Sequence, residues 1–226
     1  MTRPLLALTS LLAIAAAALP FDARSGVAAH ASRCTQEYGY AGVVGARPAA
    51  GVGARLTALD PPLVRWGHVA AWVGLSSGAP GSSSWIQAGL AGFEAGANTL
   101  YYEVARAGVS PVYTAVRYDV PAGEAHAVAV REIAGRPGAW RVWVDGAAAS
   151  PPIALAGSHH VWRPMVMAES WNGGTGACNV FRFALADLRS IGATGGAWRR
   201  LTAPRLVDAG YRLVDSGGRL LASTGP

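Results

Sequence analysis

Apolar and polar residues alternate along most of this chain in short runs. Because successive side chains of a strand point to opposite faces, Trp140, Val142 and Val144 would share one face of a strand. No stretch shows the helical period over a useful length. The alternation therefore predicts strands at residues 51–58, 68–75, 84–90, 99–105, 112–120, 126–133, 140–144, 164–170 and 180–185.

Turn-forming residues separate these runs, as in Asp60-Pro61-Pro62, Asp145-Gly146 and Asn172-Gly173-Gly174. Near the end of the chain, residues 211–215 and 219–223 flank a Ser-Gly-Gly sequence and predict a terminal hairpin. Many short strands at this spacing are typical of an all-β sandwich or jelly roll. We see no linker and no internal repeat, so one domain suffices.

The start of the chain has the pattern of an export signal. Residues 5–19 form an uncharged apolar run that is too short to span a bilayer comfortably, and a basic residue precedes it. Small residues favour cleavage after Ala31, with a site near Ala23 as the alternative. We therefore expect a signal peptide at residues 1–31 and a secreted, extracellular single β-sandwich domain at 32–226.

The chain has 226 residues and a net charge of +6, and all its basic residues are arginines. The arginines are scattered, which is typical of solvated surface. The pair Arg199-Arg200 beside Trp198 is too small a patch to indicate nucleic-acid binding. An acidic ligand has no specific support. We expect neither nucleic acid nor, after signal removal, a membrane as partner, and we expect a monomer.

Cys34 and Cys178 are the only cysteines. Export to an oxidising compartment favours a disulfide between them, with two free thiols or a metal-binding pair as the alternatives. There is no Cys/His cluster with zinc spacing. The adjacent His159 and His160 follow Gly157 in a predicted loop, and from a strand they would point to opposite sides. We expect no metal site and no cofactor.

Glu169 is the best candidate for a catalytic carboxylate. Met165 and Met167 precede it in phase, and Trp171 follows on the same predicted face. A carboxyl group on an aromatic-lined sheet face is desolvated, which raises its pKa toward general acid–base use. The alternative is an ordinary surface glutamate at the end of a strand.

Gln87 is the second candidate, in phase with Trp85 on an otherwise apolar strand. A carboxamide there either bonds to neighbouring strands in a crowded core or faces a cleft. In a cleft its N–H can stabilise a developing oxyanion while its oxygen orients a water molecule. That role needs a partner base, and Glu169 is the available one.

Several aromatic residues could line a groove, although core packing is the common role of such side chains. On one concave face they would form a stacking platform for sugars or peptide side chains. The groove candidates are Trp72, Trp85, Tyr101, Tyr102, Trp143 and Trp171. Of the residues near the candidate dyad, we expect substrate contacts from Trp72, Trp85, Tyr101, Glu103 and Trp171.

Four short motifs occur in an order that resembles the glutamic peptidases, or eqolisins, and their bacterial secreted relatives. They are Ala71-Trp72-Val73-Gly74-Leu75, Trp85-Ile86-Gln87-Ala88-Gly89, Tyr101-Tyr102-Glu103 and Ala168-Glu169. The resemblance implies a concanavalin A-like, jelly-roll sandwich of two antiparallel sheets. It matches Gln87 to the family's catalytic Gln and Glu169 to its catalytic Glu. Ser76 stands where the acid peptidases carry Asp, and Ser170 where they carry an aromatic residue.

The leading hypothesis is thus a secreted endopeptidase in which Glu169 activates water and Gln87 stabilises the oxyanion. A non-catalytic, lectin-like module that binds glycan is the first alternative. A glycoside hydrolase with Glu169 and Glu103 as its two carboxylates is the second. The partner is accordingly a polypeptide substrate or a glycan.

Overall fold

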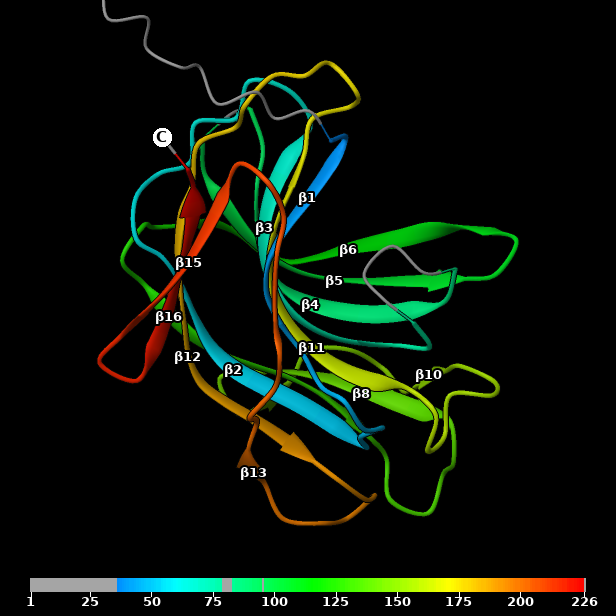
Figure 1. Cartoon of the computed structure of the whole chain (residues 1–226). Coiled ribbons are helices and arrows are strands. Elements are labelled where there is room, and N and C mark those ends of the chain that lie inside the picture. Colours follow the sequence, from blue (N-terminus) through cyan, green and yellow to red (C-terminus); the bar gives the residue numbers. More distant parts are fainter. Residues whose placement is uncertain (1–35, 79–82, 95, 226) are drawn as a thin grey trace, which may run out of the picture. The chain divides into compact units, whose positions relative to one another are not determined.

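Two antiparallel β-sheets make up the part of the chain that our computed structural model describes, residues 36–78, 83–94 and 96–225 (Figure 1). The predicted signal peptide and Cys34 lie outside these residues. The described residues contain no helix, and hence none that could span a membrane. The prediction of an all-β sandwich is confirmed.

The first sheet has seven strands and contains the four motifs that resemble the glutamic peptidases. Its second half is a meander in which each strand pairs with the next along the chain, and the figure shows β4, β5 and β6 side by side (Figure 1). In spatial order its strands are β14 (Arg205–Val207), β1 (Tyr38–Val44), β11 (Arg163–Trp171), β3 (His68–Ser76), β4 (Trp85–Gly92), β5 (Asn98–Arg106) and β6 (Val109–Val120).

The second sheet contains nine strands, two of which pair at its side. The main path runs through β10 (Ile153–Ala154), β8 (Ala139–Val144), β7 (Ala125–Glu132), β2 (Gly51–Ala58), β12 (Arg182–Ile191), β16 (Arg219–Thr224) and β15 (Tyr211–Ser216). The short strands β13 (Arg199–Arg200) and β9 (Ala147–Ala148) pair with β12 and β8. The predicted terminal hairpin is present as β15 and β16.

Each strand predicted from alternation is present, with ends shifted by a few residues. The largest shift concerns the predicted strand 180–185, because Val180 instead forms an isolated bridge with Leu63 and β12 continues to Ile191. The pattern missed β1 altogether. Its glycines hide the alternation, yet they serve packing: a Cβ on Gly42 would lie 2.1 Å from the carbonyl oxygen of Val166 on the neighbouring strand.

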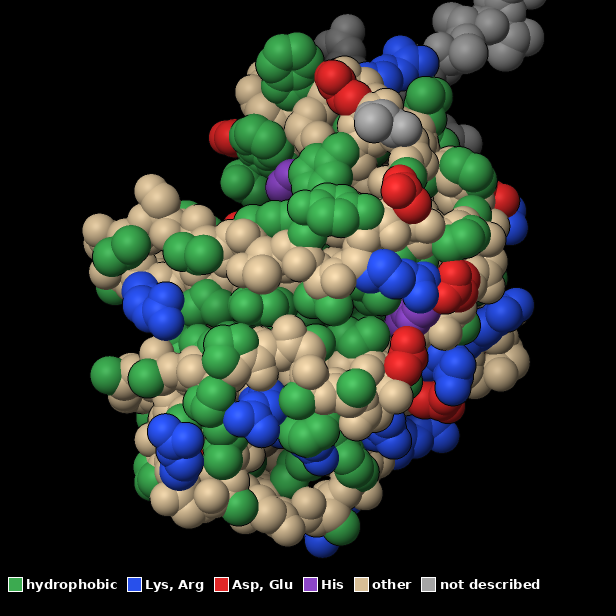
Figure 2. Space-filling view, turned by 180° about the vertical axis from the view of Figure 1, so that it is seen from behind, with side chains coloured by type: hydrophobic (Ala, Val, Ile, Leu, Met, Phe, Trp, Pro, Cys, Tyr) green, Lys and Arg blue, Asp and Glu red, His purple; other side chains and the backbone are tan. Residues whose placement is uncertain are grey.

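The core lies between the two sheets, where the apolar face of each strand is buried. Leu56 on β2 and Leu185 on β12 are fully buried on one side, and Val73 on β3 and Ile86 on β4 on the other. Arginine side chains are spread over the face seen in the space-filling view, with acidic side chains among them on one side (Figure 2). This distribution agrees with the scattered arginines of the sequence.

A smaller apolar cluster lies on the other face of the seven-stranded sheet. Trp72, Tyr101 and Met167 are at most 3% exposed there, together with Ala70, Ala91 and Met165. Alternation would leave this face to solvent in an ordinary sandwich, but here Tyr40, Val44 and Leu206 pack against the cluster. The candidate site is built on this cluster.

Candidate functional site

Four adjacent strands bring the motif residues to one face of the seven-stranded sheet. The strands lie in the order β11, β3, β4 and β5. In the register, Glu169 lies opposite Ala70, and Gln87 lies between Gly74 and Glu103. The side-chain period of two then places Glu169, Gln87 and Glu103 on the same face as Trp72. The sequence motifs thus converge through strand pairing.

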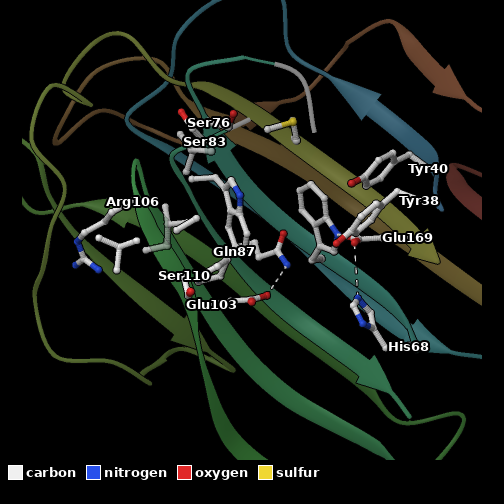
Figure 3. Close-up of a pocket in the computed structure, with 18 of the residues that line it drawn as sticks. Tyr38, Tyr40, His68, Ser76, Ser83, Gln87, Glu103, Arg106, Ser110 and Glu169 are labelled. Atoms are coloured by element: carbon white, nitrogen blue, oxygen red, sulfur yellow. Dashed lines mark hydrogen bonds and ion pairs between the residues drawn. The ribbon is translucent and has the colours of Figure 1, made fainter. Parts of the chain in front are cut away.

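A cavity of about 820 Å³ opens over this face. The close-up shows Gln87 and Glu103 on one side of it, and Glu169 with His68 on the other (Figure 3). Aromatic side chains complete much of the wall, namely Trp72, Trp85, Tyr38 and Tyr40. The lining therefore combines two carboxylates and one carboxamide with apolar surface, which is the common composition of a ligand site.

Glu169 is 6% exposed and its carboxylate is held in place. The indole Nε1 of Trp72 donates a hydrogen bond of 2.7 Å to Oε2, and the imidazole Nε2 of His68 lies 3.7 Å from Oε1. A buried carboxylate needs such partners, because burial without them is costly. Trp72 thus orients Oε2, while Oε1 lies on the His68 side.

Replacing Trp72 by Phe is expected to lower the free energy of unfolding by about 1–3 kcal/mol. The variant keeps the ring but leaves Oε2 of the buried Glu169 without its indole donor. Urea unfolding at pH 7 measures the change. The half-buried Trp85, which lines the same cavity, provides the matched control Trp85→Phe. An equal loss in both variants would refute the importance of the indole bond.

Gln87 is 9% exposed, and its amide is oriented by β5. The Nε2 group donates to the hydroxyl of Tyr101 at 3.0 Å and to Oε2 of Glu103 at 3.3 Å. Gly74 on β3 pairs with Gln87 and leaves room for the Gln87 side chain. A Cβ at position 74 would lie 3.1 Å from both the Cβ of Gln87 and the ring of Trp72. Both amide protons are engaged in the free protein.

Glu103 has a pKa above its ordinary value of 4.5. Burial raises the pKa most, and the charge of Glu169 raises it further, whereas His68 and the hydrogen bond from Gln87 lower it. A carboxyl group of this kind stays protonated to a higher pH than an exposed one.

This raised pKa predicts a pH-dependent effect of Glu103→Gln. The folded protein binds the Glu103 proton more tightly than the unfolded chain, so ionisation of Glu103 costs stability. The cost is absent below about pH 4.5 and complete above the folded-state pKa. The neutral variant is therefore expected to be more stable than wild type at pH 7 and equally stable near pH 3, by urea unfolding. A variant that is no more stable at pH 7 would contradict this account.

Two tyrosines of the site were missed in the sequence because they lie on the unpredicted strand β1. Tyr40 pairs with Glu169 in the register, and both Tyr38 and Tyr40 line the cavity. Burial, and then the charge of Glu169, raises the pKa of each phenol. They therefore remain protonated hydrogen-bond donors at physiological pH. A search for aromatic residues in glycine-rich segments would have found them.

The predicted groove aromatics fall into three groups. Trp72 and Trp85 line the cavity, and Tyr101 lies beneath it, stacked on Tyr113 at 5.0 Å between ring centroids. Trp171 lies beside the lining, where its ring packs 5.5 Å from that of His68. Tyr102 packs against the core between the sheets, and Trp143 belongs to the nine-stranded sheet. The last two cannot contact a ligand in this cavity.

No family model matches the chain, and no curated protein matches its sequence. Solved structures do match its fold. Scytalido-glutamic peptidase with a transition-state analogue inhibitor aligns with a TM-score of 0.57 and 15% identity over 83% of this chain and 98% of that one. SCP-B, a member of the eqolisin family in complex with the tripeptide Ala-Ile-His, aligns with a TM-score of 0.52 and 15% identity over the same shares.

The chain therefore has the fold of the glutamic peptidases, which confirms the resemblance at the level of fold. An immunostimulatory antigen and pseudo beta-1,3-glucanase of Mycobacterium tuberculosis also aligns, at a TM-score of 0.39 and 14% identity over 61% of this chain. At sequence identities this low, structural similarity establishes the fold alone. The chemistry of the cavity therefore has to be argued from its residues.

Proposed function

We propose that the protein is an endopeptidase of the glutamic type, with Glu169 and Gln87 as its catalytic pair. The observation that carries this proposal is that both side chains line one cavity of a fold shared with scytalido-glutamic peptidase. The carboxylate of Glu169 is buried and oriented by Trp72, as a general base must be.

In the proposed reaction Glu169 takes a proton from a water molecule, and the resulting hydroxide adds to the carbonyl carbon of the peptide. The Nε2 group of Gln87 donates a hydrogen bond to the oxyanion that forms. Protonated Glu169 then gives its proton to the leaving nitrogen as the C–N bond breaks. One carboxyl group thus serves as base and acid in turn.

For this role Gln87 must exchange a hydrogen bond, because both of its amide protons are engaged in the free protein. The bond to Glu103 is the longer, at 3.3 Å against 3.0 Å for Tyr101. We propose that the oxyanion replaces Glu103 as the acceptor while Tyr101 keeps the amide in place. Glu103, Trp72 and Trp85 would then contact the substrate beside the scissile bond, with Trp171 farther out.

A glycoside hydrolase is the second candidate. The raised pKa of Glu103, to which the charge of Glu169 contributes, suits a general acid. Strand order argues against this pairing. Glu169 on β11 lies two strands from Gln87 on β4 and three from Glu103 on β5. The carboxamide therefore stands between the two carboxylates, where a sugar ring would need room.

The experiment is proteolysis of a denatured protein from pH 2 to 7, with wild type beside Gln87→Ala and Glu169→Gln. The peptidase hypothesis expects cleavage by wild type and its loss in both folded variants, as judged by circular dichroism. A folded wild type that cleaves nothing over this range would refute it. Glycan-array binding and release of reducing sugar from polysaccharides would then separate a lectin-like module from a hydrolase.

We also propose that the protein is exported as one domain, residues 32–226, with a disulfide between Cys34 and Cys178. Such a bridge would close a long loop, which in the chain-entropy model stabilises by about 4–5 kcal/mol less any strain. Urea unfolding with and without a reductant is expected to show a loss of this order. The double variant Cys34→Ser/Cys178→Ser is expected to lose the same amount and to be insensitive to the reductant. Equal stability of wild type in both conditions would refute the bridge.

A further inference from the structure

Glu132, His159 and His160 form a second cluster of titratable side chains, built on loops and strand ends of the nine-stranded sheet. Glu132 is the last residue of β7, and the two histidines lie in the turn between β10 and β11. One ligand atom from each residue lies within 4.8 Å of the others. The candidate catalytic residues all belong to the seven-stranded sheet, so this cluster is a separate site.

The two imidazoles converge because the chain turns between them. His160 has a φ of +58°, a left-handed conformation that non-glycine residues adopt rarely. The turn brings the ring centroids of His159 and His160 to 3.7 Å from each other. Both residues lie in a turn, as the sequence predicted, so the strand geometry that would point adjacent side chains to opposite sides does not apply to this pair.

The carboxylate of Glu132 is oriented by its neighbours. Its side chain is fully buried, and it accepts hydrogen bonds from the backbone N–H of Gly138 at 2.7 Å and the hydroxyl of Thr194 at 2.5 Å. The Nδ1 of His159 lies 2.8 Å from Oε1 and 2.9 Å from Oε2. Gly138 and Thr194 lie outside the proposed ligand set, and outer partners of this kind hold metal-binding carboxylates in position in known metal sites.

We propose that Glu132, His159 and His160 bind a divalent transition-metal ion, of which Zn²⁺ fits best. Imidazole nitrogens and a carboxylate oxygen are zinc ligands at about 2.0–2.2 Å from the metal, so ligand atoms of one ion lie about 3.4 Å apart. The ligand atoms lie within 4.8 Å of one another, so they have to approach by at most about 1.4 Å to bind one ion. His160 is exposed, which provides an entry path and leaves water as the fourth ligand.

The ion would link three separate segments of the chain. Glu132 ends β7, the histidines precede β11, and Thr194 on the loop after β12 reaches the same carboxylate. A metal here would hold these loops together and stabilise the folded state, since it binds a site that the unfolded chain does not possess. This inference does not depend on the proposed peptidase activity.

The test uses full-length, tag-free protein treated with a chelator and then titrated with ZnCl₂ by calorimetry. The expected result is saturable binding of about one equivalent, with an affinity at least about tenfold weaker in His160→Ala. His160 is exposed, so this variant is expected to fold. The matched control His68→Ala removes a histidine outside the cluster and is expected to bind as wild type does. Addition of Co²⁺ is expected to give visible absorption in wild type and not in His160→Ala.

Two results would refute the proposed zinc site. Without saturable zinc binding by the folded wild type, the cluster is a metal-free contact in which His159 pairs with Glu132, and the proposal is wrong. Binding of equal strength in wild type and His160→Ala would place the metal elsewhere. A thermal shift gives a second measurement: Zn²⁺ is expected to raise the melting temperature of wild type and His68→Ala, but not that of His160→Ala.

Discussion

Glu169→Gln is expected to lower kcat/KM for the cleavage of a denatured protein by about 10³- to 10⁴-fold. The amide is nearly the same shape as the carboxylate and can keep the hydrogen bond from Trp72 to its oxygen. It cannot take a proton from water or return one to the leaving nitrogen, and each of these transfers contributes strongly to the rate. The loss is expected in kcat more than in KM, because the substrate contacts remain.

Gln87→Ala gives the second half of this prediction. Removal of one oxyanion donor costs about 10²- to 10³-fold in kcat, so a smaller loss than that of Glu169→Gln is expected. The exposed Glu94 supplies the matched control, since Glu94→Gln changes the same functional group away from the cavity. If Glu169→Gln retains wild-type activity while folded, the assignment of the general base is wrong. A loss shared by Glu94→Gln would point to a change in the preparation instead.

Trp140→Ala is expected to lower the free energy of unfolding by about 3–5 kcal/mol. Trp140 is fully buried in the core, where its ring stacks on Trp162 at 6.2 Å and its Nε1 donates to the hydroxyl of Ser158 at 2.7 Å. The substitution leaves a cavity that the surrounding rings and strands cannot fill completely. It also leaves the buried Ser158 without that donor.

Urea unfolding followed by tryptophan fluorescence and circular dichroism measures this loss. Trp66→Ala is the control, because Trp66 is 52% exposed and its truncation is expected to cost much less. Equal losses in the two variants would show that stability does not follow the packing between the sheets. A changed slope with urea in Trp140→Ala would indicate instead that the variant no longer unfolds in the same transition.

The hydrophobic pattern predicted the strands well because a strand's two faces meet different surroundings. In β8 the alternation of Trp140, Val142 and Val144 identified both the strand and its core face. The strand β1 escaped this reasoning. Its two glycines admit close contacts, with Tyr211 at Gly39 and with β11 at Gly42, and such contacts leave no periodic signal in the sequence.

The candidate site was predicted only as separate residues. Gln87 and Glu169 were identified from short motifs, and alternation predicted only which neighbours share a face with each of them on its own strand. The sequence did not contain the strand order that places β3 alone between β11 and β4, nor the register that pairs Tyr40 with Glu169. Pairing between distant segments depends on the packing of the whole sheet, which no local pattern encodes.

The pair His159 and His160 shows the same difference between what the sequence predicts and what only the tertiary structure brings together. Two adjacent histidines after a glycine give no metal-ligand spacing, and their convergence depends on the left-handed conformation of His160. Their partner, Glu132, lies 27 residues earlier. Local alternation and turn chemistry therefore determined most of the strands and their two faces, and the motifs supplied the candidate residues. Tertiary structure alone decided which of those residues meet, because contacts between distant segments arise only when the sheets assemble.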